Sequence, residues 1–250
     1  IIVLNGKNSF IGKKKKFIFS GPGMLVQKHG DINFVNVNFS GLKNVKIKGL
    51  NWTGAINLIY SNVDIKNVII EDTLGEDSIN LVNSYSNIEN LTVINSFSDA
   101  IDIDFGYLVF DKLNCKNSGN DCLDTSGAKV TGNYLTGQNV KDKLGSFGEN
   151  SSIFIKEIVG KKINIGIVSK DGSDLEVNNL ILDDTNIYAA SYEKKYFFNN
   201  SSLIVHNFNP DKMENLLSKK ILLSKNNKMI INNTAIKEYT KNKKILIKIY

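Results

Sequence analysis

The sequence predicts an all-β fold, a single-stranded right-handed parallel β-helix in which the chain winds repeatedly around one core. Similar segments recur 22 residues apart, and they begin at residues 77, 99, 121, 143, 165 and 187. A second column, Asn95, Asn117 and Asn139, has the same spacing, and each Asn follows an apolar, β-rich run. A leucine-rich repeat has a similar period, but its fixed leucines and helical segment are missing, and β-branched residues dominate the strand-like runs.

Alternation within each unit separates a buried column from a displayed one. In the unit that begins at residue 99, Ile101 and Ile103 are expected to point inward, while Asp102 and Asp104 point outward. The Asn column is expected at a sharp bend, because Asn tolerates the left-handed backbone conformation. Stacked amides in successive coils can also form a hydrogen-bonded ladder.

Three segments follow from how well the repeat is kept. Residues 1–30 are expected to form a cap with the first strands, residues 31–200 the β-helix, and residues 201–250 closing strands. Within the last segment, Asp211 to Lys220 has the composition of a short helix, and Ile245 to Ile249 has the pattern of a strand.

Composition narrows the class of protein. The chain has 250 residues and 42% hydrophobic residues, enough for one all-β domain with a sizeable core. It has no apolar run of about 18 residues that would span a membrane. It begins at Ile1 with no visible signal peptide, so we expect a processed product or an excised domain, at the cell surface or outside the cell.

Every basic residue is a lysine. The net charge is +6 and the sequence contains no arginine, so bidentate guanidinium clamps on carboxylate or phosphate are excluded. No recognition motif or Arg-rich face points to nucleic acid. The charge fits attraction to an acidic polymer better.

The two cysteines lie in consecutive strand-like runs. Cys115 follows the inward-pointing Leu113 at even spacing, which predicts a buried thiol, and a disulfide with Cys122 is the alternative. With His29 and His206 far from both, the sequence contains no metal-binding pattern of Cys and His.

The outward columns bring charged residues together. Equivalent residues of stacked coils lie about 4.8 Å apart, so Asp102 is expected over Asp124, and Asp99 over Asp121. Like charges at that spacing are costly unless carboxyls are protonated or cations compensate. We therefore predict a site with two sets of residues. The catalytic candidates are Asp99, Asp102, Asp121, Asp124, Lys143 and Lys170, and the substrate-binding candidates are Asp104, Glu149, Asp171, Tyr192 and Lys194.

Part of this pattern resembles the polygalacturonases. Ser118-Gly-Asn-Asp-Cys-Leu-Asp, with Ser98-Asp-Ala-Ile-Asp-Ile one coil earlier and Gly166-Ile-Val-Ser-Lys two coils later, is similar to their active-site segments. The resemblance implies catalytic roles for Asp99 and Asp121 and substrate binding by Lys170. The sequence departs from that family at three places, which are Asn120, Val168 and the segment Asp142-Lys143-Leu144.

A broader resemblance, over roughly residues 77–195, is to the right-handed β-helix attached to CotH-type kinase-like domains of bacterial surface and capsule-related proteins. It is carried by Asp99-Ala-Ile-Asp-Ile-Asp-Phe, Asn120-Asp-Cys-Leu-Asp-Thr-Ser-Gly and Asp142-Lys-Leu-Gly-Ser-Phe-Gly-Glu-Asn-Ser. The resemblance implies a pectate-lyase-like fold, a polysaccharide context and a fused or adjacent kinase-like domain.

Three functions are weighed on this basis. A glycosidase needs two carboxyls about 5 to 5.5 Å apart for retention or about 6.5 to 9.5 Å for inversion, and the columns allow both. A lyase or epimerase needs a base and a cation, for which Lys143, Lys170 or Ca²⁺ held by the aspartates are candidates. A non-catalytic glycan-binding or scaffolding module is the alternative, with Tyr188, Tyr192 and Tyr196 as stacking residues or as core closure.

Overall fold

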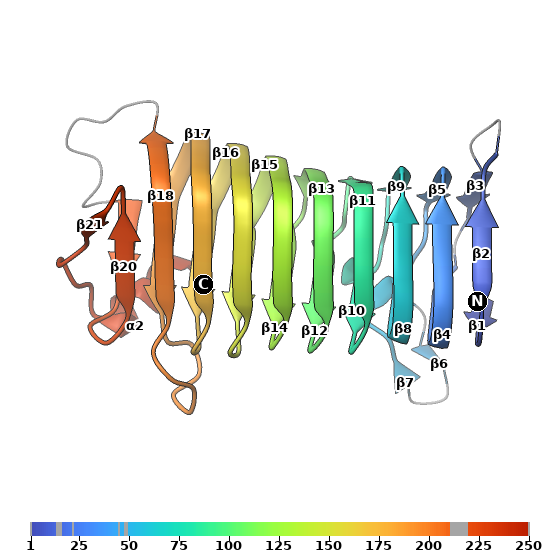
Figure 1. The fold of residues 1–250 in the computed structure, drawn as a ribbon, viewed down its shortest axis with the longest axis horizontal. Helices are drawn as coiled ribbons and strands as arrows, with labels where there is room; N and C mark the ends of the chain where they lie inside the picture. Colours follow the sequence, from blue (N-terminus) through green and yellow to red (C-terminus); the bar gives the residue numbers. More distant parts are fainter. Residues whose placement is uncertain are drawn as a thin grey trace.

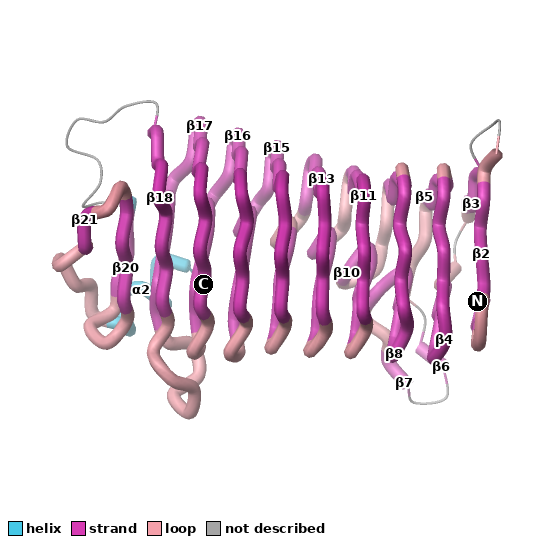
Figure 2. The backbone as a smooth tube through the Cα atoms, viewed as in Figure 1, coloured by secondary structure: helices cyan, strands magenta, loops and turns pink. Residues whose placement is uncertain are grey.

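A computed structural model describes residues 2–13, 17–21, 23–44, 46–47, 50–210 and 220–249. The chain forms a β-solenoid of about nine turns, wound right-handed from the N-terminus to the C-terminal end (Figure 1). Strands make up most of the chain (Figure 2). The predicted all-β parallel β-helix is confirmed.

The strands follow one another around the coil. Before the regular repeat they are β1 (Ile2–Leu4), β2 (Asn8–Ile11), β3 (Phe17–Ser20), β4 (Leu25–Val35), β5 (Val37–Ser40), β6 (Lys46–Ile47), β7 (Leu50–Asn51), β8 (Gly54–Lys66) and β9 (Val68–Glu71). Within it they are β10 (Asp77–Val82), β11 (Tyr85–Ile94), β12 (Asp99–Asp104), β13 (Tyr107–Ser118), β14 (Leu123–Ser126), β15 (Lys129–Gly148), β16 (Ser152–Lys170) and β17 (Asp174–Tyr192). The C-terminal elements are β18 (Ser202–Pro210), β19 (Ile221–Leu223), β20 (Lys228–Ile231), β21 (Thr234–Ala235) and the helix α2 (Asn242–Ile249).

The pairing register explains the repeat. β10 pairs in parallel with β12 so that Asp77 faces Asp99, and β12 pairs with β14 so that Asp102 faces Asp124. The same coil-to-coil pairing continues through β15, β16 and β17. At the N-terminal end, β1 to β3 pair in parallel with β4 and β5 and form the first turn.

The Asn column lies at a left-handed bend, as predicted. Asn95, Asn117 and Asn139 have φ of 56°, 58° and 58°. The Asn117 side-chain amide donates to Asn95 Oδ1 at 2.8 Å, and the Asn139 amide donates to Asn117 Oδ1 at 2.9 Å. Asn95 in turn donates to the Asp72 carboxylate at 2.7 Å, so side-chain hydrogen bonds from three amides join four coils at this bend.

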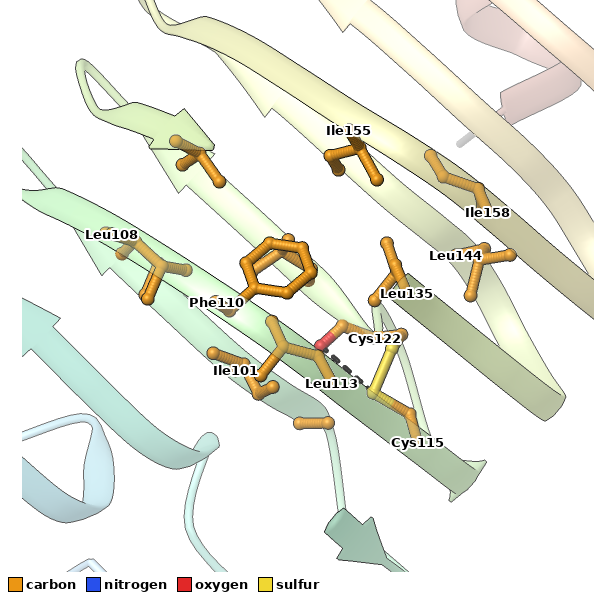
Figure 3. Packing of buried hydrophobic residues seen from close by; sticks show 14 of the residues in the cluster. Ile101, Leu108, Phe110, Leu113, Cys115, Cys122, Leu135, Leu144, Ile155 and Ile158 are labelled. Atoms are coloured by element: carbon orange, nitrogen blue, oxygen red, sulfur yellow. Dashed lines mark hydrogen bonds between the residues drawn. A yellow bond between two sulfur atoms is a disulfide. The ribbon is translucent and has the colours of Figure 1, made fainter. Parts of the chain in front are cut away.

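The inward columns form one continuous apolar core along the coil axis. Around its middle Ile101, Leu108, Phe110, Leu113 and Leu135 are buried and pack across the coil (Figure 3). Since each coil adds the same inward positions, the core grows by stacking and does not depend on contacts far apart along the axis.

The cysteine prediction needs a correction. Cys115 and Cys122 are both buried, as expected, but they are joined by a disulfide with 5.7 Å between their Cα atoms and are not free thiols (Figure 3). Cys115 lies in β13 and Cys122 lies just before β14, so the bond connects one coil to the next. A seven-residue separation around the bend brings the two inward-pointing Cβ atoms together, which periodicity alone did not show.

The C-terminal end also differs from the prediction. Residues 242–249, expected in part as a strand, form the helix α2. Ile245 and Ile249 are one helical turn apart and are both buried, against Tyr192 and Leu222 among others. The helix predicted at 211–220 lies, apart from Lys220, outside the described residues. Over the described part of the chain, no helix has the length and apolarity needed to cross a membrane.

Replacing Asn117 tests the amide ladder. Asn117→Ala loses two exposed hydrogen bonds, each worth about 1 kcal/mol, and replaces a residue that tolerates the left-handed region with one that does not, at a further cost of about 1–2 kcal/mol. Asn117→Gly loses only the hydrogen bonds. Urea unfolding is therefore expected to show Ala less stable than Gly, and Gly less stable than the parent chain. Equal stability of the Ala and Gly variants would contradict the backbone assignment.

Candidate functional site

Three columns of polar residues lie side by side on the outward face of the sheet that begins each coil, which we call the acidic face. They come from the start of β8, from β10, β12 and β14, and from the ends of β15 and β16. The leading column is Asp77, Asp99, Asp121 and Lys143. The central column is Asn57, Asn80, Asp102, Asp124 and Ser146. The trailing column is Asp104, Ser126, Gly148 and Lys170.

Apolar clusters bound the acidic face at both ends along the coil axis. Toward the N-terminus, the central column continues to Val26, which is buried with Met24 and Ile59 against Trp52. Toward the C-terminus it continues to Val168, in a cluster that α2 covers through Ile245. The polar columns therefore occupy only the middle coils.

The leading column is tied from coil to coil by carboxylate-to-backbone hydrogen bonds. Asp99 Oδ1 accepts from the Asp121 backbone N–H and from the Asn120 amide, both at 2.7 Å. Asp121 Oδ1 accepts from the Lys143 backbone N–H at 2.9 Å and lies 3.5 Å from Lys143 Nζ. The Lys143 ammonium also pairs with Asp142. These bonds fix where each first strand begins.

Burial changes the acidity of this column. It raises the pKa of Asp99 to about 7, with the Asp124 charge adding to the effect and the hydrogen bond from Asp121 opposing it. Burial likewise raises the pKa of Asp121 to about 7, against the opposing charge of Lys143. For Asp77, one coil earlier, burial raises the pKa to about 6. Asp99 and Asp121 therefore have pKa values near neutral pH.

The central column joins two carboxyls with different surroundings. Burial raises the pKa of Asp102 well above its ordinary value, and the charges of Asp104, Asp77 and Asp124 raise it further. The Asn80 amide donates to Asp102 Oδ2 at 3.1 Å. Asp124, the register partner of Asp102 in the next coil, lies 3.6 Å from Lys170 Nζ. Lys170 also donates to Ser146 Oγ at 2.7 Å, which holds its ammonium over the central column.

The trailing side is acidic next to β12 and balanced by lysine farther on. Burial, together with the Asp124 and Glu149 charges, raises the pKa of Asp104. For Glu149, burial would raise the pKa, but hydrogen bonds from Lys195 and Ser126 and the Lys195 charge outweigh it and lower the pKa. Glu149 is accordingly ion-paired with Lys195.

The structure brings most of the predicted site residues together. The six predicted catalytic residues all lie in the leading, central and trailing columns. Of the predicted substrate-binding residues, Asp104 lies in the trailing column and Glu149 directly follows Gly148 of that column. Lys194 is exposed, and its backbone N–H donates to Asp171 Oδ1. The catalytic and binding roles of these residues remain predictions.

Two predicted substrate-binding residues are corrected. Tyr192 is fully buried in the cluster under α2, so its ring is not available to a sugar and closes the core instead. Asp171 is also fully buried, and its Oδ1 accepts from the backbone N–H groups of Lys194 and Lys195 at 2.6 and 2.7 Å. Its role is to fix the loop after β17.

The sequence analysis missed Asp77 and Asn80. Asp77 is buried and extends the leading column by one coil, and Asn80 links Asp77 to Asp102 with donor distances of 3.3 and 3.1 Å. The signal was present, because Asp77 begins the unit 22 residues before Asp99. Over the described residues, no group of three His, Cys, Asp or Glu side chains is arranged to hold a metal ion, so Ca²⁺ remains a prediction.

Comparison with known proteins gives only a distant structural likeness. No protein-family model matches the chain, and no curated protein matches it. Among solved structures it is similar to the catalytic domain of a GH87 alpha-1,3-glucanase, studied as a variant in complex with tetrasaccharides, with 12% sequence identity and a TM-score of 0.31. The match covers 90% of this chain and 63% of that one, so the chain spans less than two thirds of that domain. A likeness at this level carries no information about the reaction.

The raised pKa values of the buried carboxyls predict that stability falls as the pH rises. Asp99 has a folded pKa of about 7 against an ordinary 3.8, so between those values the folded state binds the extra proton. Stability is then greatest below pH 4 for this group and falls as pH rises through 7. Each pH unit in that interval corresponds to at most about 1.4 kcal/mol.

Thermal unfolding between pH 5 and pH 8 tests this dependence. The parent chain is expected to melt at a lower temperature at pH 8 than at pH 5. Asn at position 99 keeps the acceptor oxygen but carries no charge, so Asp99→Asn should flatten the dependence. Asp174→Asn, at an exposed carboxylate on another face, is the control and should leave the dependence unchanged. A melting temperature that rises from pH 5 to pH 8 would contradict the assigned acidities.

Proposed function

We propose that the acidic face cleaves a glycosidic bond of a polysaccharide, with Asp102 as the proton donor and Asp124, ion-paired with Lys170, as its partner. The observation that carries the proposal is that these two carboxyls are register partners in adjacent coils with opposite surroundings. Asp102 is surrounded by other carboxyls, which favours its protonated form, while Asp124 is ion-paired with Lys170. Two neighbouring carboxyls, one that favours its protonated form and one that is paired with a cation, suit the roles of an acid and of a nucleophile or base.

The spacing favours one stereochemical course. Strands of adjacent coils lie about 4.8 Å apart, and two carboxyls about 5 to 5.5 Å apart are typical of retaining glycosidases. Asp102 would protonate the leaving oxygen, and Asp124 would attack or stabilise the sugar cation. Water would then release the sugar, with Asp102 now acting as the base.

The lysines argue against the lyase and epimerase alternatives. Such a reaction needs a cation exposed to the uronate carboxylate and a base that removes the neighbouring proton. Lys143 is 2% exposed and Lys170 is 6% exposed, and both ammonium groups are paired with aspartates of the site. We assign them to charge compensation and to holding the carboxyls.

A non-catalytic glycan-binding module is the second candidate. Exposed aromatic side chains favour it, since Phe97 and Phe105 lie just before and just after β12 with 69% and 58% exposure. Aromatic faces pack against the apolar faces of sugars, and this contact needs no chemistry. The cell-surface setting and the fused or adjacent kinase-like domain implied by the CotH resemblance belong to both candidates.

A panel of acidic and neutral polysaccharides, with and without Ca²⁺, tests the proposal. Hydrolysis is expected to release reducing ends without the ultraviolet absorbance of unsaturated uronates. Asp102→Asn should lower kcat by at least about 10²-fold, the size of a lost general acid, while Asp174→Asn remains active. Unsaturated products would show a lyase, and binding without any product would favour the second candidate. Full turnover by Asp102→Asn would remove this residue from the reaction.

A further inference from the structure

Phe105 directly follows Asp104 at the end of β12, the strand that also carries Asp99 and Asp102. Its side chain is 58% exposed, and its backbone is left-handed with φ of 53°. The left-handed region is disfavoured for residues with a Cβ, and for a bulky side chain it is an outlier. The residue therefore carries local strain at the edge of the acidic face.

The fold requires the bend but not the phenylalanine. The equivalent residue one coil earlier is Asn83, with φ of 46°, and one coil later it is Gly127, with φ of 64°. The three share the same cross-coil hydrogen bond, from each backbone N–H to a carbonyl of the next coil. Asn and Gly adopt this conformation readily. Other residue types also occur at this bend, among them Glu149 with φ of 62° one coil after Gly127, so the bend itself does not require a phenylalanine.

The Phe105 ring packs directly against the backbone at Gly127. A Cβ on Gly127 would lie 2.7 Å from Phe105 Cδ1 and 3.0 Å from Cε1, so only glycine at position 127 leaves room for the ring where it is. Tyr60, at the same bend two coils earlier, differs because it stacks on His29 at 5.3 Å. Within the described part of the chain, Phe105 makes no ring-to-ring contact, and more than half of its side chain faces solvent.

We propose that Phe105 is a sugar-binding platform, on which a pyranose ring of the substrate packs its apolar face next to Asp102 and Asp104. The proposal rests on the proposed function and extends it to a positioning residue. A planar apolar ring beside carboxyls matches the two kinds of surface that a sugar presents, its C–H face and its hydroxyl edge. The left-handed backbone of Phe105 and the packing against Gly127 hold the ring in place, which limits the conformational entropy lost on binding.

Phe105→Asn tests the platform without harming the fold. Asn is the residue that the preceding coil uses at this bend, so the variant should unfold at the same temperature or a higher one. On a polysaccharide that the parent chain cleaves, its KM is expected to rise roughly tenfold, which corresponds to about 1.4 kcal/mol of lost binding, with little change in kcat. Gly127→Ala displaces the ring while keeping it, and should raise KM in the same direction.

Controls separate this proposal from the proposed function. Phe154→Asn removes a partly exposed aromatic ring outside the acidic face and should leave KM unchanged. An unchanged KM in Phe105→Asn, with turnover abolished in Asp102→Asn, would overturn the platform and leave the proposed function standing. A lower unfolding temperature in Phe105→Asn would also overturn it, because the ring would then be structural. If the parent chain cleaves no polysaccharide of the panel, and if none of them slows its migration in affinity gel electrophoresis, both proposals fail.

Discussion

The cross-coil register of parallel backbone hydrogen bonds is the constraint on which the rest of this structure depends. Since the first strand repeats every 22 residues over the middle coils, each side chain lies over its equivalent in the next coil. An apolar residue placed inward extends the core, and an Asn placed at the bend extends a ladder. The same rule makes an outward aspartate meet another aspartate about 4.8 Å away.

Stacked aspartates are expensive for a folded chain. Two full charges at about 4.8 Å repel by about 3 to 4 kcal/mol at the effective dielectric constant of a protein surface. The chain reduces this cost by keeping protons on Asp99 and Asp102, and by placing Lys143 and Lys170 beside Asp121 and Asp124. The result is a set of carboxyls with different surroundings, some among other carboxyls and some beside a lysine. Apolar clusters then close both axial ends, so the charged columns are confined to the middle coils.

The sequence was informative wherever one period determined the contacts. The left-handed Asn117 and the pairing of Asp102 with Asp124 follow from spacing alone. Beyond the end of the repeat, the sequence has no equivalent segment from which the contacts could be predicted. Ile245 to Ile249 fits both a strand and a helix, and packing against the outward-facing Tyr192 decides for the helix. That contact also buries Tyr192, whose register partner in the preceding coil is Lys170.

Other features depend on three-dimensional geometry that a linear pattern does not carry. The disulfide between Cys115 and Cys122 needs two inward side chains to meet across a bend. The strain at Phe105 depends on its backbone φ angle, and the position of its ring depends on the missing Cβ of Gly127. Asp171 resembled its neighbours in charge and position, yet it is buried and bonded to the backbone of the next loop.

The most direct measurement is a carboxyl-carbon NMR titration of the folded protein, with Asp99 and Asp102 assigned through their Asn variants. The account predicts that Asp99 titrates near pH 7 and that Asp102 titrates well above its ordinary range. Midpoints near 4 for both residues would mean that the stacked carboxyls are ionised at neutral pH. In that case the acidic face would hold no proton to donate.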